Sequence, residues 1–483
     1  MTPTDWLILL PELWVGALLL VLLVLDMSLP SEQHPQLGIV AGIGLLAVIP
    51  ILLWQNKLGM QTLWGGMYQL DPLALFFKGI SVLTAAATVL MTRELAHTIQ
   101  RGHGEFYLLI LTAALGMMFV ASSSNFLMLF VSLELITISF YVMTAYLKTD
   151  LRSLEAGLKY LILGSVASGL FLYGIAFLYG STGSTQFSDI AAAVAKGTPL
   201  PPGLLLGLLL ILGGILFKAA CVPFHLWVPD VYEGAPTPVT AFLSVGSKAA
   251  GFLIALRVLD QLFLPAHLEW MALIVCVAGL TILYGNLGAI SQKNIKRLFG
   301  YSSIGHAGYL LIGVACVSNF ASGAVLYYLA GYLFTNLAAF LVITTFSKQT
   351  GSDEIKDYAG LSHRSPFLAA VMFISLLSLA GVPPLAGFFG KFLLLLSAAS
   401  MIPAWGGYFW LIIIGAAGVV ISLYYYLTLV KTMYVDPPVD PTPISVSLSV
   451  RIALLVCLAG ILILGIWQTP FLNLSLIAAK SLF

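Results

Sequence analysis

Charged side chains are scarce in this sequence of 483 residues: Asp, Glu, Lys and Arg make up 8% of it, whereas hydrophobic residues make up 60%. Soluble proteins contain roughly 25% charged residues, so the composition excludes a soluble globular enzyme. Neither sign of charge is in excess, because 21 basic and 20 acidic residues leave a formal net charge of +1. A chain without a strong net charge is not expected to bind nucleic acid. We therefore expect its partners within a membrane.

Cysteine is also rare, with four residues in the whole chain. Zinc and iron–sulfur sites use closely spaced cysteines, and the sequence has no C-x-x-C pair. We therefore interpret the cysteines, which lie far apart within apolar runs, as packing residues. They are Cys221, Cys276, Cys316 and Cys457.

Long apolar segments are what the sequence has in abundance. A helix needs about 20 residues to cross the hydrocarbon core of a bilayer, and the polar and turn-forming residues divide the chain into fourteen such segments. The sequence therefore predicts an all-α polytopic membrane protein. The predicted spans are 5–26, 36–54, 70–92, 105–121, 125–147, 157–180, 203–229, 238–260, 268–290, 299–318, 322–347, 366–400, 408–431 and 450–468.

Two of these segments, 203–229 and 366–400, are longer than one straight crossing needs, and both contain proline. Because proline lacks the backbone N–H and interrupts a helix, each segment is predicted to be a broken helix. Each also carries an intramembrane lysine, Lys218 or Lys391. Interrupted helices in corresponding positions of two halves indicate a transporter built from inverted repeats. The two segments lie five spans apart, an odd number, so the two repeats would enter the membrane from opposite sides.

The distribution of basic residues predicts the orientation of the chain. A signal peptide begins with basic residues, but no Lys or Arg precedes the first span. We therefore interpret this span as an uncleaved transmembrane helix. If the N-terminus is outside, twelve basic residues fall on the inner side and four on the outer side, which favours both termini outside. The four outer residues are Lys57, Lys196, Arg257 and Lys480.

Ionisable residues within the spans are the candidates for function, because a charge at mid-span costs roughly 2.5–3.5 kcal/mol. Glu134 lies in NFLMLFVSLELITISFYVM, and Lys218 lies in GILFKAACVPFHLWVPD. We interpret them as a carboxylate–ammonium pair that switches a proton; the alternative is a static salt bridge between helices. Lys248 shares a helix face with Ser244 and Gly251, small residues that let another helix or a file of water approach.

Three further residues are candidates for a proton relay. His225, beyond the first proline break, and His306, in RLFGYSSIGHAGYLLIG, are each interpreted either as relay groups or as packing histidines. Lys159 follows Glu155 by four residues, and this pair is either part of the relay or an ordinary helix-surface contact. Lys78, in ALFFKGISVL, is interpreted as a snorkelling residue or a contact to a neighbouring subunit.

Several long motifs resemble one known family. They are SLEAGLKYLILGS, FKAACVPFHLWVPDVYEGAPTPVTAFLSVGSKAA, QKNIKRLFGYSSIGHAGYLLIG, YLAGYLF and LSLAGVPPLAGFFGKF. Over about residues 105–435, the chain resembles the antiporter-like membrane subunits of respiratory complex I, and in particular the subunit N type. Relatives in the same family carry a glutamate in place of the twelfth-helix lysine or continue into a long lateral helix. Here Lys391 is a lysine and the chain stops soon after the last span, which favours the N type.

This resemblance implies fourteen helices, two inverted five-helix repeats with broken seventh and twelfth helices, and a proton route along a central polar axis. The implied division is 1–104 for three N-terminal helices, 105–262 and 263–435 for the repeats, and 436–483 for the last helix. The family's proton-transfer residues fall on Glu134, Lys218, Lys248 and Lys391, with His225 and His306 in relay positions.

The function that the resemblance implies is proton translocation within an NADH:quinone oxidoreductase of the bacterial plasma membrane, with both termini periplasmic. We expect no cofactor in this chain, and NADH, FMN, iron–sulfur clusters and quinone in other subunits. The expected partners are membrane subunits, including a second antiporter-like subunit and small helical subunits, together with lipids. The alternative is a subunit of a multisubunit cation/proton antiporter.

The relay hypothesis predicts that Lys248→Arg blocks proton transfer although it keeps the positive charge, because arginine is not deprotonated in proteins. The measurement is proton pumping by the assembled complex in sealed vesicles. An arginine variant that pumps like the wild type would count against a relay through Lys248.

Overall fold

A computed structural model describes residues 3–96, 99, 102–197, 199–438 and 440–483. Within these residues, twelve helices are long and apolar enough to cross a membrane. The two predicted broken segments add one interrupted crossing each, which gives fourteen. The all-α polytopic fold predicted from the sequence is confirmed, and the one sheet among the described residues is a hairpin of two short strands.

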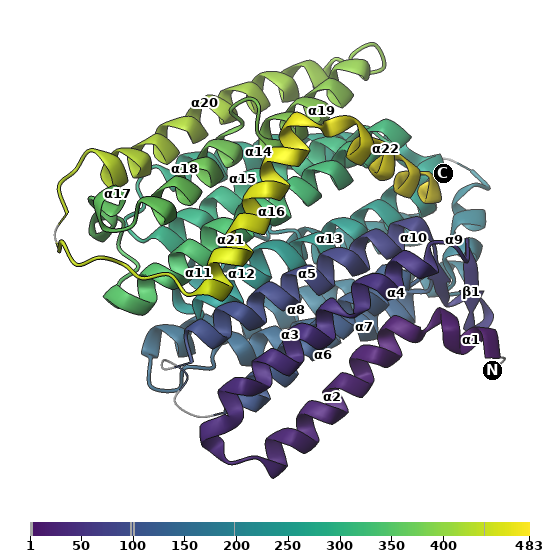
Figure 1. The fold of residues 1–483 in the computed structure, drawn as a ribbon. Helices are drawn as coiled ribbons and strands as arrows, with labels where there is room; N and C mark the ends of the chain where they lie inside the picture. Colours follow the sequence, from purple (N-terminus) through teal and green to yellow (C-terminus); the bar gives the residue numbers. More distant parts are fainter. Residues whose placement is uncertain (1–2, 97–98, 100–101, 198, 439) are drawn as a thin grey trace. The chain divides into compact units, whose positions relative to one another are not determined.

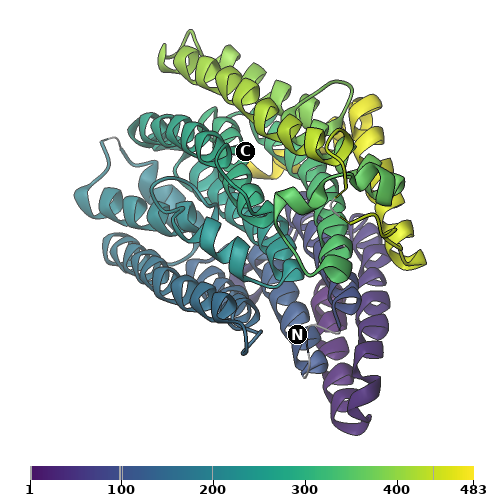
Figure 2. The ribbon, with the colours of Figure 1, turned by 90° about the vertical axis from the view of Figure 1, so that its left-hand side faces the viewer.

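The N-terminal part of the chain forms three spans and this hairpin. The purple helices α2, α3 and α5 lie side by side in both ribbon views (Figure 1, Figure 2). Strands β1 and β2 are antiparallel, with Thr62 opposite Gln69. The elements are α1 (Pro3–Ile8), α2 (Leu10–Ser28), α3 (Leu37–Leu46), α4 (Val48–Gln55), β1 (Gln61–Leu63), β2 (Tyr68–Leu70) and α5 (Pro72–Glu94).

Helices account for most of the remaining chain. In order they are α6 (His103–Ser122), α7 (Phe126–Thr144), α8 (Leu151–Thr182), α9 (Phe187–Val194), α10 (Pro202–Lys218), α11 (Trp227–Gly234), α12 (Thr237–Phe242), α13 (Lys248–Ala255), α14 (His267–Ala289), α15 (Ile295–Ala315), α16 (Asn319–Thr350), α17 (Leu361–Arg364), α18 (Pro366–Ala380), α19 (Ala386–Ser400), α20 (Gly407–Tyr434), α21 (Leu448–Ile466) and α22 (Gln468–Ala479). The chain forms two compact units: 1–219, 246–270 and 477–483 in unit 1, and 220–245 and 271–476 in unit 2.

Both predicted helix breaks are present. The first apolar segment is helical until Lys218, and helix resumes in α11 at Trp227, with Pro223 between them. The second is helical until Ala380 and resumes in α19 at Ala386. Gly381, the C-cap of α18, has φ +89°, a left-handed conformation that glycine adopts without steric cost.

The eighth span, 237–262, is unusual because two stretches of π-helix interrupt it. The π-helical segments η3 (Leu243–Ser247) and η4 (Leu256–Leu262) flank α13, whose first residue is Lys248. Single π-helical turns inside α-helices often mark functional positions. The sequence pattern gave no indication of them.

The turns after α8 and α16 share a sequence pattern. Both helices contain 32 residues and end at a glycine with positive φ. Residues 182–189 read TGSTQFSD, and residues 350–357 read TGSDEIKD. Ser184 donates to Asp189 at 2.6 Å, and Ser352 donates to Asp357 at 2.5 Å.

The two turns also make the same backbone contacts with a preceding asparagine. Asn125, the N-cap of α7, bridges to Gln186 within unit 1, and Asn294, the N-cap of α15, bridges to Glu354 within unit 2. The two turns therefore share both a sequence pattern and a backbone contact, one in each unit.

Two glycines allow α8 and α10 to pack closely in unit 1. A Cβ added at Gly174 of α8 would lie 2.8 Å from the carbonyl oxygen of Gly207 in α10, and one at Gly207 would lie 3.1 Å from the carbonyl oxygen of Gly174. Small residues at helix interfaces let backbones approach this closely in membranes. The contact fixes α8 against the helix that carries Lys218.

A buried ion pair joins two of the N-terminal helices. Lys78 of α5 is fully buried, and its Nζ lies 2.7 Å from Glu12 of α2 and 2.7 Å from the hydroxyl of Tyr68. The prediction that Lys78 snorkels or contacts a neighbouring subunit was therefore wrong. Its sequence neighbours could not reveal the partner, because Glu12 lies in another helix.

We expect Glu12→Leu to destabilise the protein by about 3–5 kcal/mol, because it leaves the Lys78 ammonium buried without its counter-charge. The double variant Glu12→Leu/Lys78→Met should recover most of this loss, since replacing both partners by apolar residues is often neutral. Thermal unfolding of the detergent-solubilised protein measures both effects. A double variant as unstable as the single one would contradict the assignment.

Candidate functional site

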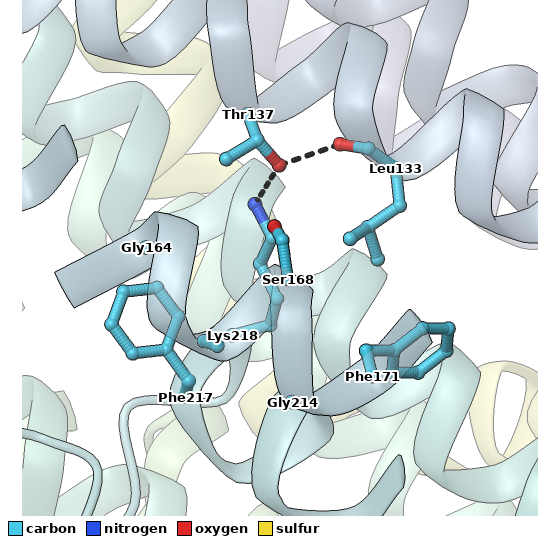
Figure 3. A pocket seen from close by; sticks show the side chains of 9 residues that line it. Leu133, Thr137, Gly164, Ser168, Phe171, Gly214, Phe217 and Lys218 are labelled. Carbon is cyan, nitrogen blue, oxygen red and sulfur yellow. Dashed lines mark hydrogen bonds between the residues drawn. The ribbon is translucent and has the colours of Figure 1, made fainter. Parts of the chain in front are cut away.

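In unit 1, the predicted pair Glu134 and Lys218 is held by two hydroxyl groups. Lys218, the last residue of α10, donates from Nζ to the Thr137 hydroxyl on α7 at 2.6 Å (Figure 3). Glu134, also on α7, accepts a 2.6 Å hydrogen bond from the hydroxyl of Ser168 on α8. The structure therefore brings the two predicted residues to one site, but gives each charge its own neutral partner.

A cavity lies at this site, and its size matches about one water molecule. Its wall is mostly apolar, with Lys218, Thr137 and Ser168 as the polar lining groups; Figure 3 shows the lysine amine directed at Thr137. The apolar lining residues include Leu133, Ala167, Phe171 and Phe217. Electrostatic interactions beside such an apolar wall are stronger than in bulk water.

Helix ends and close packing position these side chains. The side chain of Asn125 caps the first turn of α7 through the N–H of Leu127 at 2.8 Å. Lys218 sits in the last turn of α10, where a cation interacts favourably with the helix dipole. A Cβ at Gly214 of α10 would lie 2.8 Å from the Cβ of Phe171, so this glycine allows α8 to approach the lysine-bearing helix.

Lys248 lies close to the same break in the chain. Its side chain is 1% exposed, and α13 packs against α10, α5 and α6 within unit 1. Gly251, three residues after Lys248, faces the backbone at the end of α10, since a Cβ there would lie 3.0 Å from the Ala219 nitrogen. The close helix approach predicted from this small residue is confirmed.

His225 lies in unit 2, in the short segment before α11. Its side chain is buried, and its ring packs edge-on against Tyr284 with the ring centroids 4.1 Å apart. Among the described residues, neither ring nitrogen has a hydrogen-bond partner. The segment is fixed by a 3.1 Å hydrogen bond from the Val222 N–H to the Thr281 hydroxyl.

Lys391, in the second broken helix, caps the carbonyl groups at the break. Its Nζ donates to the carbonyl oxygens of Leu379 at 2.7 Å and Ala380 at 3.2 Å, the last residues of α18. It also lies 4.8 Å from the centroid of the Tyr309 ring. Carbonyl groups at a helix end have no partner within the helix, so the break itself creates the binding site for the lysine amine.

His306 on α15 is the centre of a buried tyrosine cluster in unit 2. Its Nδ1 pairs with the hydroxyl of Tyr328, and its Nε2 lies 3.3 Å from the hydroxyl of Tyr426. His306 and Tyr328 line a second water-sized cavity together with Ser378 and Leu379, whose carbonyl binds Lys391. The structure therefore brings His306 and Lys391 to the same part of unit 2.

Lys159 is the candidate on the most exposed surface. It lies on α8, with 43% of its side chain exposed, and pairs with Glu155 at 2.7 Å. Pairs of this type at i and i+4 contribute little to stability. The predicted contact between Glu155 and Lys159 is present.

A second buried ion pair in unit 1 was missed from the sequence. Arg257 donates from Nη2 to both carboxylate oxygens of Asp71 at 3.0 Å and to the carbonyl of Ala121 at 2.9 Å. Arg257 lies in η4, at the end of the eighth span, with 2% exposure. Asp71 also caps α5 by accepting from the Ala74 N–H at 2.7 Å, so the pair fixes α5 to the end of the eighth span. In the sequence, Asp71 followed by Pro72 is a signal for a helix cap, but no local signal points to Arg257 as a partner of Asp71.

The fold and these buried charges define a class of protein: a polytopic helical membrane protein with ionisable groups inside broken helices, as in ion-translocating transporters. Residues 123–422 match the model of a family described as NADH:quinone oxidoreductase/Mrp antiporter, transmembrane. The match covers more than half of the chain, which therefore belongs to this family.

Individual relatives agree with the family match. The chain is 44% identical over 474 residues to NADH-quinone oxidoreductase subunit N of Moorella thermoacetica, covering 98% of each chain. It is 42% identical to NAD(P)H-quinone oxidoreductase subunit 2 of a Synechococcus species, covering 96% of this chain and 89% of the relative.

Solved structures show the same fold. A chain of respiratory complex I from Thermus thermophilus with bound aureothin superimposes with a TM-score of 0.80 at 31% identity, covering 96% of this chain and 98% of that chain. A chain of the Mrp complex from a Dietzia species superimposes with a TM-score of 0.87 at 21% identity, covering 100% and 98%. The second likeness concerns the fold alone.

We expect Lys391→Met to abolish proton translocation and leave assembly intact, because the side chain binds carbonyl groups of its own chain. Lys356→Met, which changes an exposed lysine of the same unit, is the control. Proton pumping in vesicles and native gel electrophoresis measure the two effects. Loss of a neighbouring subunit from the Lys391→Met complex would favour the alternative that Lys391 anchors a partner.

Proposed function

We propose that this chain is an antiporter-like, proton-translocating subunit of an NADH:quinone oxidoreductase, of the subunit N type. The observation that carries the proposal is the set of buried ionisable groups at the helix breaks of a fold shared with complex I. Lys218, Lys248 and Lys391 are 6%, 1% and 3% exposed. A buried charge is costly and is retained in membrane proteins mostly for function.

In unit 1, Glu134 and Lys218 form the switch. Whether Lys218 holds a proton depends on how near the glutamate carboxylate lies, because an adjacent anion stabilises the ammonium form. Lys218 and Ser168, the partner of Glu134, line one mostly apolar cavity, and this dependence is strong in such surroundings. Lys248, on the helix that packs against the end of α10, is the next group in the route.

In unit 2, His306 and Lys391 continue the route. The hydroxyls of Tyr328 and Tyr426 hold both nitrogens of His306, so the imidazole is fixed in orientation and can accept a proton on one side and release one on the other. We propose Lys391 as the last group before release to the outer side. His225 and Lys159 are proposed as additional relay groups.

We propose the division into 1–104, 105–262, 263–435 and 436–483, and the repeated turns at 182–189 and 350–357, one in each five-helix part, support it. In the register that we propose, which aligns Asn125 with Asn294, Glu134 lies nine residues after Asn125, and Ser303 lies nine residues after Asn294. Thr137 and His306 lie twelve residues after the same asparagines. The two repeats are therefore proposed to share a fold while differing in chemistry, with an ion pair in the first and a histidine–tyrosine cluster in the second.

The proposed setting is the bacterial plasma membrane, with both termini on the periplasmic side. Other membrane subunits, including a second antiporter-like subunit and small helical subunits, are the proposed partners. Oxidation of NADH through FMN and iron–sulfur clusters and reduction of quinone would take place in the remaining subunits. A role in a stand-alone cation/proton antiporter is less well supported, because the similarity to the Mrp complex structure concerns the fold alone.

The proposal predicts that Glu134→Ala or Lys218→Ala lowers quinone-linked proton pumping by about tenfold or more. Either change removes the dependence of the Lys218 proton on the nearby carboxylate, and a change of roughly 1.4 kcal/mol in that dependence shifts an equilibrium tenfold. Pumping by the assembled complex in proteoliposomes is the measurement, with Glu32→Ala, at an exposed site, as the control. Normal proton stoichiometry in an assembled Glu134→Ala variant would refute the switch.

A further inference from the structure

The hydroxyl of Thr137 is a specialised acceptor for Lys218. It donates its one proton to the carbonyl oxygen of Leu133 at 2.6 Å and accepts from the Lys218 amine at 2.6 Å (Figure 3). A hydroxyl has one proton and two lone pairs. Since the proton is bonded within the helix, Thr137 presents only lone pairs to the cavity, as an acceptor for an ammonium group should.

Ser168 has the opposite role toward Glu134. Its hydroxyl donates to the Glu134 carboxylate at 2.6 Å, a distance typical of a charge-assisted hydrogen bond. This donor comes from α8, whereas the acceptor for Lys218 comes from α7. Lys218 and Glu134 therefore each form a hydrogen bond with a neutral hydroxyl group in place of a direct ion pair with each other.

Nearby serines and threonines do not behave this way. Ser139 and Thr144 of α7, and Ser165 of α8, each donate to the carbonyl group four residues earlier, at 2.7–2.8 Å. This back-bonding is the common arrangement of hydroxyl side chains in membrane helices. Thr137 makes the same back-bond, to Leu133, but it also accepts a hydrogen bond from Lys218 on another helix. Ser168 donates its proton to Glu134 on another helix instead.

Separating opposite charges in apolar surroundings is unfavourable unless each charge keeps a hydrogen bond. The cavity beside Lys218 has room for about one water molecule and a mostly apolar wall, so it offers the lysine few other partners. The two hydroxyls are therefore the groups that can make the separated arrangement a stable state.

We propose that Thr137 and Ser168 are positioning residues that hold Lys218 and Glu134 apart and so create the open state of the proton switch. The proposal rests on the proposed function in one respect, namely that the pair controls proton transfer. The two hydroxyls stabilise a state in which Lys218 can exchange its proton. Without them, the pair collapses into a direct ion pair and the switch stays closed.

The first test compares Thr137→Val and Ser168→Ala with the wild type in the assembled complex reconstituted into proteoliposomes. We expect quinone-linked proton pumping to fall by about tenfold in each, since losing a hydrogen bond to a charged group shifts an equilibrium by roughly this factor. Thr137→Ser and Ser168→Thr keep the hydroxyls and should restore most of the activity. The matched controls Thr144→Val, Ser139→Ala and Ser165→Ala should pump normally.

The second test reports on Glu134 itself. Infrared difference spectra of the complex, oxidised against NADH-reduced, contain carboxylate bands, and the band lost in Glu134→Gln belongs to Glu134. Ser168→Ala should shift this band because it removes the hydrogen bond to the carboxylate, whereas Ser165→Ala should leave it in place. A purely structural role of Ser168 would leave the band unchanged in both variants.

The outcomes separate this inference from the function on which it rests. If Glu134→Ala and Lys218→Ala lose pumping while Thr137→Val and Ser168→Ala keep it, the hydroxyl inference is wrong and the switch remains. If all four pump normally, the proposed function of the pair is wrong. An unshifted Glu134 band in Ser168→Ala would overturn the role of Ser168 even if pumping fell.

Discussion

The cost of a charge inside the hydrocarbon layer is the constraint on which the rest of this structure depends. Four of the buried cations have polar neighbours within their own unit: a carboxylate for Lys78 and Arg257, a hydroxyl for Lys218, and helix-end carbonyls for Lys391. Carboxylate partners give fixed pairs that hold helices together, as between α2 and α5. Neutral partners bind a protonated lysine without fixing its charge, which suits residues that must lose and regain a proton.

The interrupted helices supply these neutral partners. A continuous membrane helix satisfies its own backbone groups, and nothing remains to bind a side chain. Ending α18 at Ala380 leaves carbonyl oxygens that Lys391 binds, and ending α10 at Lys218 places the amine in the last turn of its helix. The prolines and Gly381 therefore matter for the chemistry as much as for the fold.

The two units place different chemistry on a common plan. Asn125 and Asn294 begin corresponding helices, and the turns at 182–189 and 350–357 repeat the same hydrogen bonds. In the proposed register, a glutamate and a threonine in unit 1 correspond to Ser303 and His306 in unit 2. Since neither His306 nor its tyrosine partners carry a permanent charge, neutral hydrogen bonds hold this histidine in place.

The sequence by itself determined the membrane class, the fourteen crossings and the two helix breaks, because hydropathy and proline act locally along the chain. It also identified Glu134, Lys218, Lys248 and Lys391 as ionisable groups within spans, since a charged residue within an apolar run is visible in one dimension. Only the tertiary structure decided their partners. Thr137 and Ser168 look like any hydroxyl residue of a membrane helix, Glu12 and Lys78 are 66 residues apart, and Arg257 lies at a span end that resembles a loop. Hydrogen bonds between helices depend on which faces meet, and that is set by the packing of the whole chain.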